Sequence, residues 1–219
     1  MSEKLETKKI VFTVEGETEQ WYLEWLRDQI NKCEDRDYNI AVEAKVQQSP
    51  KKFFKTVNAK TTPEVYHICD VESNEQVHVD KLKNILSEMK DAKTQKRITY
   101  KLGYSNFTFE LWMVLHKRNC NGSLSHRRQY LDSINKAFGE NFENLDQYKH
   151  EDNFKRCLKK LSLDEVVEAI KRADAIMDNN KKDQKVIIQY KGYKYYKDNP
   201  ALSIHEAVRM ILTESGVYR

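Results

Sequence analysis

The sequence contains few of the residues that interrupt or cross-link a fold. Among its 219 residues there are 3 prolines and 6 glycines, a composition far from that of a low-complexity or collagen-like chain. The 4 cysteines lie far apart and form no CxxC pair, so we expect neither a structural zinc site nor a disulfide framework. These are Cys33, Cys69, Cys120 and Cys157.

Long hydrophobic segments are absent as well. No apolar run approaches the roughly 20 residues that a helix needs to span a bilayer. Residues 1–9 are mostly polar and lack the apolar core of a signal peptide. We therefore expect a reduced, cytoplasmic protein without membrane contact.

Neither sign of charge dominates the chain. It has 38 lysines and arginines against 34 acidic residues, and the net charge of +4 is too small to identify a partner. Charged residues make up 33% of the sequence, but 12 tyrosines, 8 phenylalanines and 3 tryptophans supply large apolar side chains. This composition predicts a folded protein, and the length suits one main domain with an accessory region.

Strand and helix patterns alternate along the first half of the chain. Short apolar or alternating runs predict four strands, at residues 10–14, 38–46, 64–69 and 97–102. Helices are predicted to start near Thr18 and Ser49 and to cover residues 79–90. Strands alternating with helices indicate an α/β fold with a mainly parallel four-stranded sheet flanked by helices.

The second half of the chain has mainly helical patterns. Residues 105–117 are apolar nearly all round, which predicts a buried helix. Further helices are predicted at residues 125–138, 163–177 and 203–213. We assign residues 1–117 to a core domain and residues 118–219 to a mostly helical C-terminal region packed on it.

Acidic residues follow two of the predicted strands. Glu15 comes directly after the first strand, where Gly16 permits a sharp turn, and Asp70 and Glu72 follow the third. Carboxyl ends of parallel strands meet at one edge of a sheet, where α/β proteins bind ligands. Converging carboxylates repel each other unless a cation such as Mg²⁺ neutralises them. Alternatively, the acids after Gly16 favour a helix N-terminus and Asp70 begins a turn.

Three motifs resemble the RloB-like proteins, a branch of the Toprim superfamily. "VEGETE" at residues 14–19 matches the Toprim glutamate and glycine, and "CDVESNE" at residues 69–75 matches the DxD element with Glu72 in place of the second Asp. "SNFTFELWMVLH" at residues 105–116 is similar to a segment characteristic of the RloB-like branch, as is "NPALSIHEAVRMIL" at residues 199–212. The resemblance spans nearly the whole chain and implies a Toprim-like core.

The resemblance implies a nuclease dependent on Mg²⁺ or Mn²⁺ that acts in anti-phage or abortive-infection defence. It implies a nucleic-acid substrate, with RNA such as tRNA favoured over DNA, and an ATPase partner protein. Glu15 would be the general acid or base, and Asp70 and Glu72, with Glu15, would bind the metal. A non-catalytic module that binds nucleic acid or an ATPase is the alternative, and a phosphatase with Asp70 as nucleophile is a further one.

Three more residues are candidate auxiliary members of the site. Glu75 is a candidate extra metal ligand. Glu110 lies among large apolar residues, where it is either a further acid of the site or a partnered structural carboxylate. His116 is a candidate proton carrier, with a capping or phosphate-binding role as the alternative.

Two stretches rich in basic residues are candidates for binding nucleic acid. Residues 116–128 supply Lys117, Arg118, Arg127 and Arg128. Residues 185–197 interleave lysines with tyrosines, and we single out Lys191, Tyr193 and Lys194, because lysines contact phosphates and tyrosines stack on unpaired bases. A solvated basic loop and a surface hairpin with half its tyrosines in the core would give the same patterns.

Overall fold

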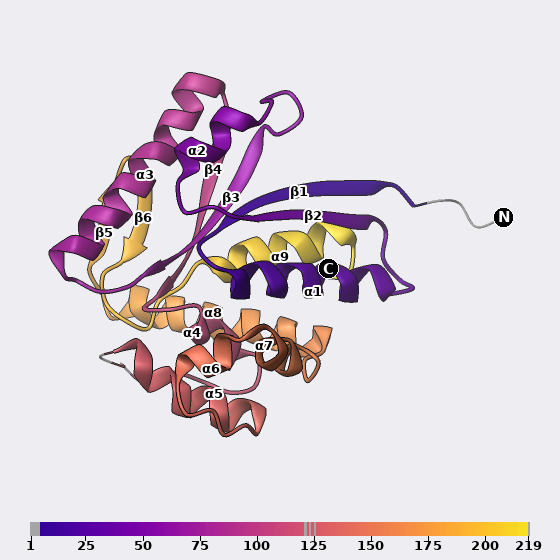
Figure 1. Ribbon diagram of the computed structural model, residues 1–219, viewed down its shortest axis with the longest axis vertical. Coiled ribbons are helices and arrows are strands. Elements are labelled where there is room, and N and C mark those ends of the chain that lie inside the picture. The colour runs from indigo at the N-terminus through magenta and orange to yellow at the C-terminus, as the bar shows by residue number, and fades with distance from the viewer. Residues whose placement is uncertain (1–4, 121, 123, 125, 219) are drawn as a thin grey trace.

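The computed structural model describes residues 5–120, 122, 124 and 126–218. Its centre is a sheet of four parallel strands in the order β2, β1, β3, β4 (Figure 1). The strands are β1 (Thr7–Val14), β2 (Asn39–Val46), β3 (Glu64–Val71) and β4 (Thr99–Asn106). The predicted α/β fold with a parallel four-stranded sheet is therefore confirmed.

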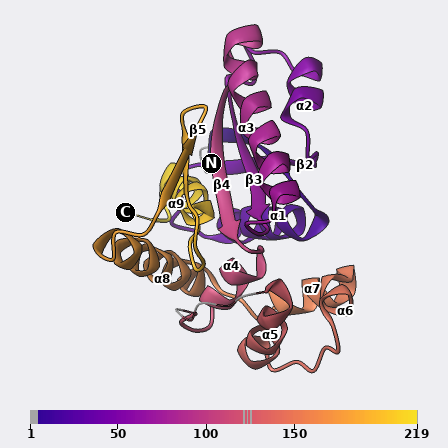
Figure 2. The same cartoon turned by 90° about the vertical axis from the view of Figure 1, so that its left-hand side faces the viewer.

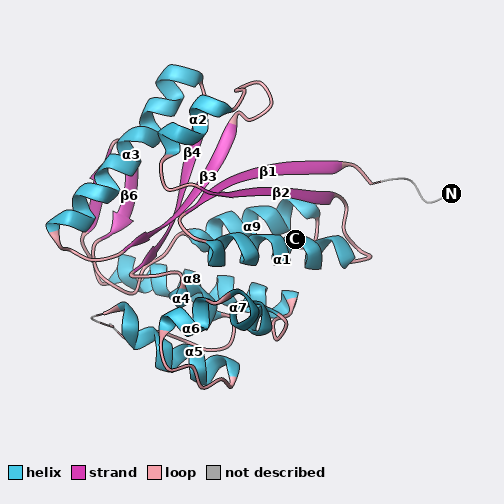
Figure 3. Ribbon diagram, viewed as in Figure 1, coloured by secondary structure: helices cyan, strands magenta, loops and turns pink. Residues whose placement is uncertain are grey.

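Helices cover both faces of this sheet. One face packs against α1 (Glu17–Lys32) and α9 (Ile204–Ser215), and the other packs against α2 (Pro50–Thr56) and α3 (Gln76–Lys96), as Figure 3 shows. Side chains alternate along β3, so Ile68 is buried on the α1 side and Cys69 on the α3 side. Each face thus has its own apolar core.

Local sequence signals set several helix ends. The Ser49 hydroxyl accepts a hydrogen bond from the Lys52 N–H at 3.2 Å, and Pro50 occupies the first turn, so α2 begins where the sequence predicts. Ser162 and Glu165 form a capping box at the start of α8 (Leu163–Lys182). The predicted helix starts near Thr18, Ser49 and residue 163 are confirmed.

A helical lobe lies beyond the carboxyl ends of β3 and β4 (Figures 1 and 2). Together with α8 it contains α4 (Glu110–Leu115), the 3₁₀ turn η1 (Arg127–Gln129), α5 (Tyr130–Phe138), α6 (Leu145–Lys149) and α7 (Glu151–Leu158). The lobe shares one apolar core with the α1 side of the sheet, since Phe12 of β1 and Ile170 of α8 belong to the same buried cluster. The predicted helical C-terminal region is confirmed.

Residues 185–197 form a β-hairpin against β4. Strands β5 (Ile187–Tyr190) and β6 (Tyr193–Tyr196) are antiparallel and joined by Lys191 and Gly192, both at positive φ, as tight hairpin turns require. The Tyr196 N–H donates to the Tyr104 hydroxyl at 3.0 Å. Tyr195 and Tyr196 are buried, so two tyrosines of the hairpin belong to the apolar core.

The predicted helix over residues 105–117 is wrong in its extent. Only Glu110–Leu115 is helical, because Ser105 and Asn106 still belong to β4, where they pair with Asp70 and Val71. The Asn106 N–H also donates to the Ala201 carbonyl at 2.9 Å. A strand end covered on both sides, followed by a short helix whose six residues are all buried, produces the apolar pattern of a longer helix.

Gly103 marks a close approach between β4 and its neighbours. A Cβ at this position would lie 2.5 Å from Cδ1 of the buried Ile68 and 3.5 Å from Cα of Ile204. We expect Gly103→Ala to lower the free energy of unfolding by about 1–3 kcal/mol, as overpacked cores do. Urea denaturation measures this, with Gly122→Ala as control, because a Cβ there meets nothing within 4 Å. Equal stability of both variants would contradict the close packing.

None of the helices in the described residues is both long enough and apolar enough to cross a membrane.

Candidate active site

Two of the candidate residues, Glu15 and Asp70, meet at the carboxyl ends of the neighbouring strands β1 and β3. Strand β2 lies on one side of β1 and β3 on the other, so the carboxyl ends of β1 and β3 form the switch point at which open α/β sheets bind ligands. Val14 pairs with Ile68 there, which places Glu15 beside the end of β3. The Asp70 N–H donates to Oε2 of Glu15 at 3.0 Å. The sheet register therefore brings Glu15 and Asp70 together, although 55 residues separate them.

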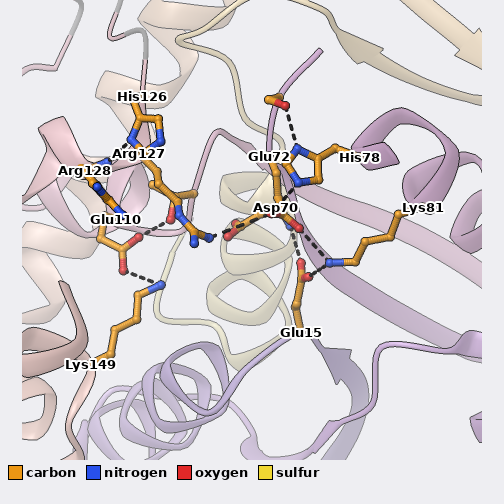
Figure 4. A network of polar contacts seen from close by, with 12 residues as sticks. Glu15, Asp70, Glu72, His78, Lys81, Glu110, His126, Arg127, Arg128 and Lys149 are labelled. Atoms are coloured by element: carbon orange, nitrogen blue, oxygen red, sulfur yellow. Dashed lines mark hydrogen bonds and ion pairs between the residues drawn. The ribbon is translucent and has the colours of Figure 1, made fainter. Parts of the chain in front are cut away.

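Lys81 of α3 joins Glu15 to Glu72. Its Nζ lies 2.6 Å from Oε1 of Glu15 and 2.8 Å from Oε1 of Glu72 (Figure 4). His78, three residues earlier on the same face of α3, has Nε2 3.5 Å from Oε2 of Glu72. Burial alone would raise the pKa of Glu72, but the hydrogen bond from Lys81 lowers it below its ordinary value. Although burial opposes it, the two carboxylates raise the pKa of Lys81, so this ammonium is charged.

Asp70 faces a second group of charges on the side of the helical lobe. Glu110 is fully buried at the start of α4, and its Oε1 lies 3.1 Å from Nζ of Lys149. Glu19 is buried in the first turn of α1. Burial and the charges of Glu19, Glu15 and Glu110 raise the pKa of Asp70 well above its ordinary value. Figure 4 shows Asp70 between the Glu110–Lys149 pair and the Glu15–Lys81 pair.

The side chain of Glu19 is buried next to Gly16, in the turn that follows β1. Burial raises the pKa of its carboxyl group, while Lys149 and a 3.0 Å hydrogen bond from the Thr18 hydroxyl oppose this effect. A Cβ on Gly16 would lie 3.1 Å from Oε2 of Glu19, so the glycine gives the carboxylate room. The VEGETE motif thus supplies two acids, Glu15 and Glu19, and the small residue between them.

Asp70 and Glu72 turn toward different parts of the site. Strand β3 ends at Val71, so the alternation that would place both side chains on one face stops before Glu72. Glu72 contacts Lys81 and His78 of α3, and it also lies 3.9 Å from Arg127 of the helical lobe. Asp70 and Glu72 would project together only if the extended strand continued to Glu72, and it ends at Val71, so their contacts differ.

Cavities flank the acids on both sides. One of about 490 Å³ is lined by Glu15, Lys81, Lys52 and Glu88. A smaller one of about 250 Å³ is lined by Glu72, His78 and Lys197. A ligand can therefore approach the Glu15–Lys81–Glu72 bridge from either side.

Two of the three auxiliary candidates lie outside this arrangement. Glu75 is exposed and occupies the N-cap position of α3. His116 is buried, and its Nδ1–H donates to the Trp112 carbonyl at 2.9 Å, so its Nε2 accepts from the Tyr22 hydroxyl at 3.0 Å. Burial lowers the pKa of His116 to about 4. A histidine held neutral by two core partners has the environment of a structural residue.

Basic residues from the segment 116–128 have different surroundings. Arg127, on η1, reaches the site, with Nη1 3.9 Å from Oε2 of Glu72, and Arg128 beside it is exposed. Lys117 is held by Glu165 at 2.5 Å and by the Lys160 carbonyl at 2.6 Å. Arg118 is exposed at the end of α4. Of the four, Arg127 is the one that the fold brings to the acids.

The candidate residues of the hairpin lie along the outer edge of β4. Tyr193 and Lys194 line a cavity of about 730 Å³ together with Tyr100 and Lys101 of β4. The Tyr193 hydroxyl donates to the Tyr100 carbonyl at 3.3 Å, and Lys191 occupies the hairpin turn. This cavity is separate from the two that flank the acids. Three residues of this stretch, Ile188, Tyr195 and Lys197, line a cavity together with Glu72.

The residue types at the switch point fit a hard divalent cation, which prefers carboxylate oxygens. The surroundings of Asp70 support this fit, because a cation would offset the repulsion between its carboxylate and the charges of Glu19, Glu15 and Glu110. Within the described residues, no three acidic, histidine or cysteine side chains are already gathered in a metal-binding group. The Lys81 ammonium bridges Glu15 and Glu72 instead, so a cation there requires this ammonium to move.

Sequence analysis did not identify Lys81, His78 or Lys149. These side chains reach the acids from α3 and α6, and nothing in their local sequence marks them. Glu19 was visible in the VEGETE motif, but its position in the first helical turn indicated a dipole interaction rather than burial. The burial of Glu19 depends on the packing of α1 against the helical lobe, which the sequence does not show.

A protein-family model described as RloB-like protein matches residues 10–211, a span that includes all the acids described above. No curated protein and no solved structure gives a significant match.

Proposed function

Because the chain belongs to the RloB-like protein family, we propose that it is a Toprim-type nuclease that hydrolyses phosphodiester bonds with a divalent metal ion. The observation that carries this proposal is the pairing of Glu15 and Asp70 at the switch point of the sheet, joined by the 3.0 Å hydrogen bond. Two cationic side chains contact the acids of the site, Lys81 at Glu15 and Glu72 and Arg127 at Glu72. Acids with cationic side chains beside them suit a phosphate group and its metal ion.

Asp70 and Glu72, with Glu15, would hold Mg²⁺ or Mn²⁺ in this mechanism. The ion would polarise the scissile phosphate and offset its developing charge. We infer that Glu15 moves a proton for the attacking water or the leaving oxygen, because its side chain is only 16% exposed and lines a cavity. Glu110 and Lys149 form an ion pair whose charges act on Asp70 from the side of the helical lobe.

Arg127 is the best-placed residue for holding the substrate phosphate. Its side chain is 55% exposed and its contact with Glu72 is long, so it is free to turn toward a ligand. A planar guanidinium binds phosphate oxygens in pairs. The exposed Arg128 and Arg118 extend the positive surface on the lobe, and Lys191, Tyr193 and Lys194 would contact a longer strand beyond the hairpin.

We propose RNA, with tRNA as one example, as the substrate and anti-phage or abortive-infection defence as the setting, with an ATPase as partner protein. These assignments come from the resemblance of the VEGETE, CDVESNE and SNFTFELWMVLH motifs. Unpaired RNA suits the stretch 185–197, where basic residues are interleaved with tyrosines. A toxic nuclease also requires restraint, which a partner protein can provide.

A second candidate function is a non-catalytic module that binds nucleic acid or an ATPase. It is favoured by the Lys81 bridge, which already neutralises Glu15 and Glu72 without a metal. Such a module would bind a divalent cation weakly and leave RNA intact. Turnover distinguishes the two functions.

Sequencing RNA 5′ and 3′ ends from cells that express the wild type or Glu15→Gln, with and without phage, tests the proposed nuclease. We expect new ends at discrete positions with the wild type and their loss with Glu15→Gln, because glutamine keeps the shape of Glu15 and removes its charge and proton acceptor. Glu17→Gln is the matched control, since Glu17 is an exposed acid in the same motif. Identical ends from wild type and Glu15→Gln would contradict the catalytic role of Glu15.

A further inference from the structure

Lys81 occupies an unusual position for a lysine in a site built of acids. Its ammonium lies within 2.8 Å of two carboxylates that come from the ends of two different strands. It uses Oε1 of Glu15, while Oε2 of the same residue accepts from the Asp70 backbone. It likewise uses Oε1 of Glu72, whose Oε2 faces His78. The ammonium thus binds one oxygen of each carboxylate, and a cation held by Glu15 and Glu72 would need the same oxygens.

We propose that Lys81 is an internal counter-ion that competes with the divalent cation for Glu15 and Glu72 and so weakens the site's affinity for the metal. This inference rests on the proposed function, because it concerns the same site. In the metal-free protein Lys81 holds the two carboxylates together, and the metal displaces it.

The competition follows from charge and space. An ammonium and a divalent cation repel each other strongly at the few ångströms that a shared carboxylate pair allows. Glu15 and Glu72 are only 16% and 21% exposed, so solvent screens this repulsion less than it would on an open surface. The same two carboxylates cannot fully satisfy both cations, and the lysine lowers the occupancy of the metal.

Lys81 also has room to leave. Its side chain is 40% exposed, and the cavity of about 490 Å³ that it lines continues to Asn84 and Glu88 along α3. Lysine has a flexible four-carbon stem, so its ammonium can move into this cavity without a change in the backbone.

A purely structural salt bridge would behave in the opposite way. If Lys81 only aligned the two carboxylates for the metal, its removal would let them separate and would weaken metal binding. A counter-ion that competes for the carboxylates strengthens metal binding when it is removed. The direction of the change in affinity therefore separates the two roles.

Titration of the purified protein with Mn²⁺, followed by electron paramagnetic resonance of the free ion, measures this affinity directly. We expect Lys81→Met to bind Mn²⁺ at least about tenfold more tightly than the wild type, which corresponds to about 1.4 kcal/mol. Lys81→Arg retains the charge and should stay within about threefold of the wild type. Lys90→Met, on an exposed position of α3, is the control for loss of a surface charge on the same helix. Circular dichroism melts verify that each variant is folded.

Each outcome decides a different point. Tighter binding by Lys81→Met alone supports the counter-ion. Equal or weaker binding by Lys81→Met, or tightening by Lys90→Met to the same extent, overturns it and leaves the proposed metal site intact. Absence of Mn²⁺ binding to the wild type and to Lys81→Met overturns the metal site, and with it both the proposed function and the counter-ion.

Discussion

An Asp70→Asn variant should cleave RNA at least about a hundredfold more slowly than the wild type and should be no less stable. Asparagine keeps the shape of the side chain but removes a negative charge that the proposed metal site needs. The same charge is unfavourable in the protein without metal, because the carboxyl group is buried and the charges of Glu19, Glu15 and Glu110 lie near it. Function and stability therefore respond to this substitution in opposite directions.

The pH dependence of stability follows from the raised pKa of Asp70. A carboxyl group with a higher pKa in the folded than in the unfolded state binds more protons when folded. Its contribution to stability is fully present below the unfolded pKa and is lost as the pH rises through the folded pKa. Asp70→Asn removes this loss, so its melting temperature should equal or exceed that of the wild type at neutral pH.

Cleavage of a labelled single-stranded RNA and thermal melting, both on purified protein, measure the two effects. The RNA is one that the wild type cleaves in the presence of Mg²⁺. Asp35→Asn is the matched control, because Asp35 is an exposed residue in the turn after α1. An Asp70→Asn protein that cleaves as fast as the wild type would exclude Asp70 from catalysis. A lower melting temperature with unchanged cleavage would identify Asp70 as a structural residue.

Trp112→Ala should lower the free energy of unfolding by about 3–5 kcal/mol, as truncation of a fully buried tryptophan does. Trp112 lies at the centre of α4, with its ring 4.8 Å from that of His116 and 6.1 Å from that of Tyr22. Alanine at this position leaves a cavity between the sheet and the helical lobe. The loss is large because both parts of the molecule line this cavity.

Urea denaturation followed by circular dichroism measures this loss. Trp25→Ala is the matched control, since Trp25 is only partly buried and packs at the edge of the same core. Trp112→Phe should lose less than Trp112→Ala and keeps the comparison possible if the alanine variant does not fold. A Trp112→Ala loss no larger than that of Trp25→Ala would contradict the central position of α4.

Much of the sheet could be predicted from the sequence because buried strands have a strong local pattern. The run at residues 10–14 is apolar and rich in β-branched residues, and the run at residues 64–69 contains Val65, Tyr66 and Ile68, residue types that favour strands. The boundary between strand and helix at Asn106 was missed because the strand end at Ser105 and Asn106 and all six residues of α4 are buried. Periodicity does not separate a doubly covered strand end from a buried helix.

The candidate site could be predicted only in part. Glu15 and Asp70 follow from strand order, since the carboxyl ends of adjacent parallel strands share an edge. Lys81 and Lys149 depend on how α3 and α6 are placed against that edge, which is a property of the tertiary packing. The roles of Glu15, Asp70, Glu72, Glu75, Glu110 and His116 in catalysis remain predictions for the experiments above, as does the Toprim relationship.

The chain is synthesised from its N-terminus, so α9 is the last of the helices on the sheet to be made. Strands β1 to β4 end at Asn106, but their α1-side core needs α9, which begins at Ile204. At ribosomal rates of about 5–20 residues per second, the roughly one hundred intervening residues take about 5–20 s. Until α9 is made, the α1-side core is incomplete, so this face of the sheet is covered only late in translation.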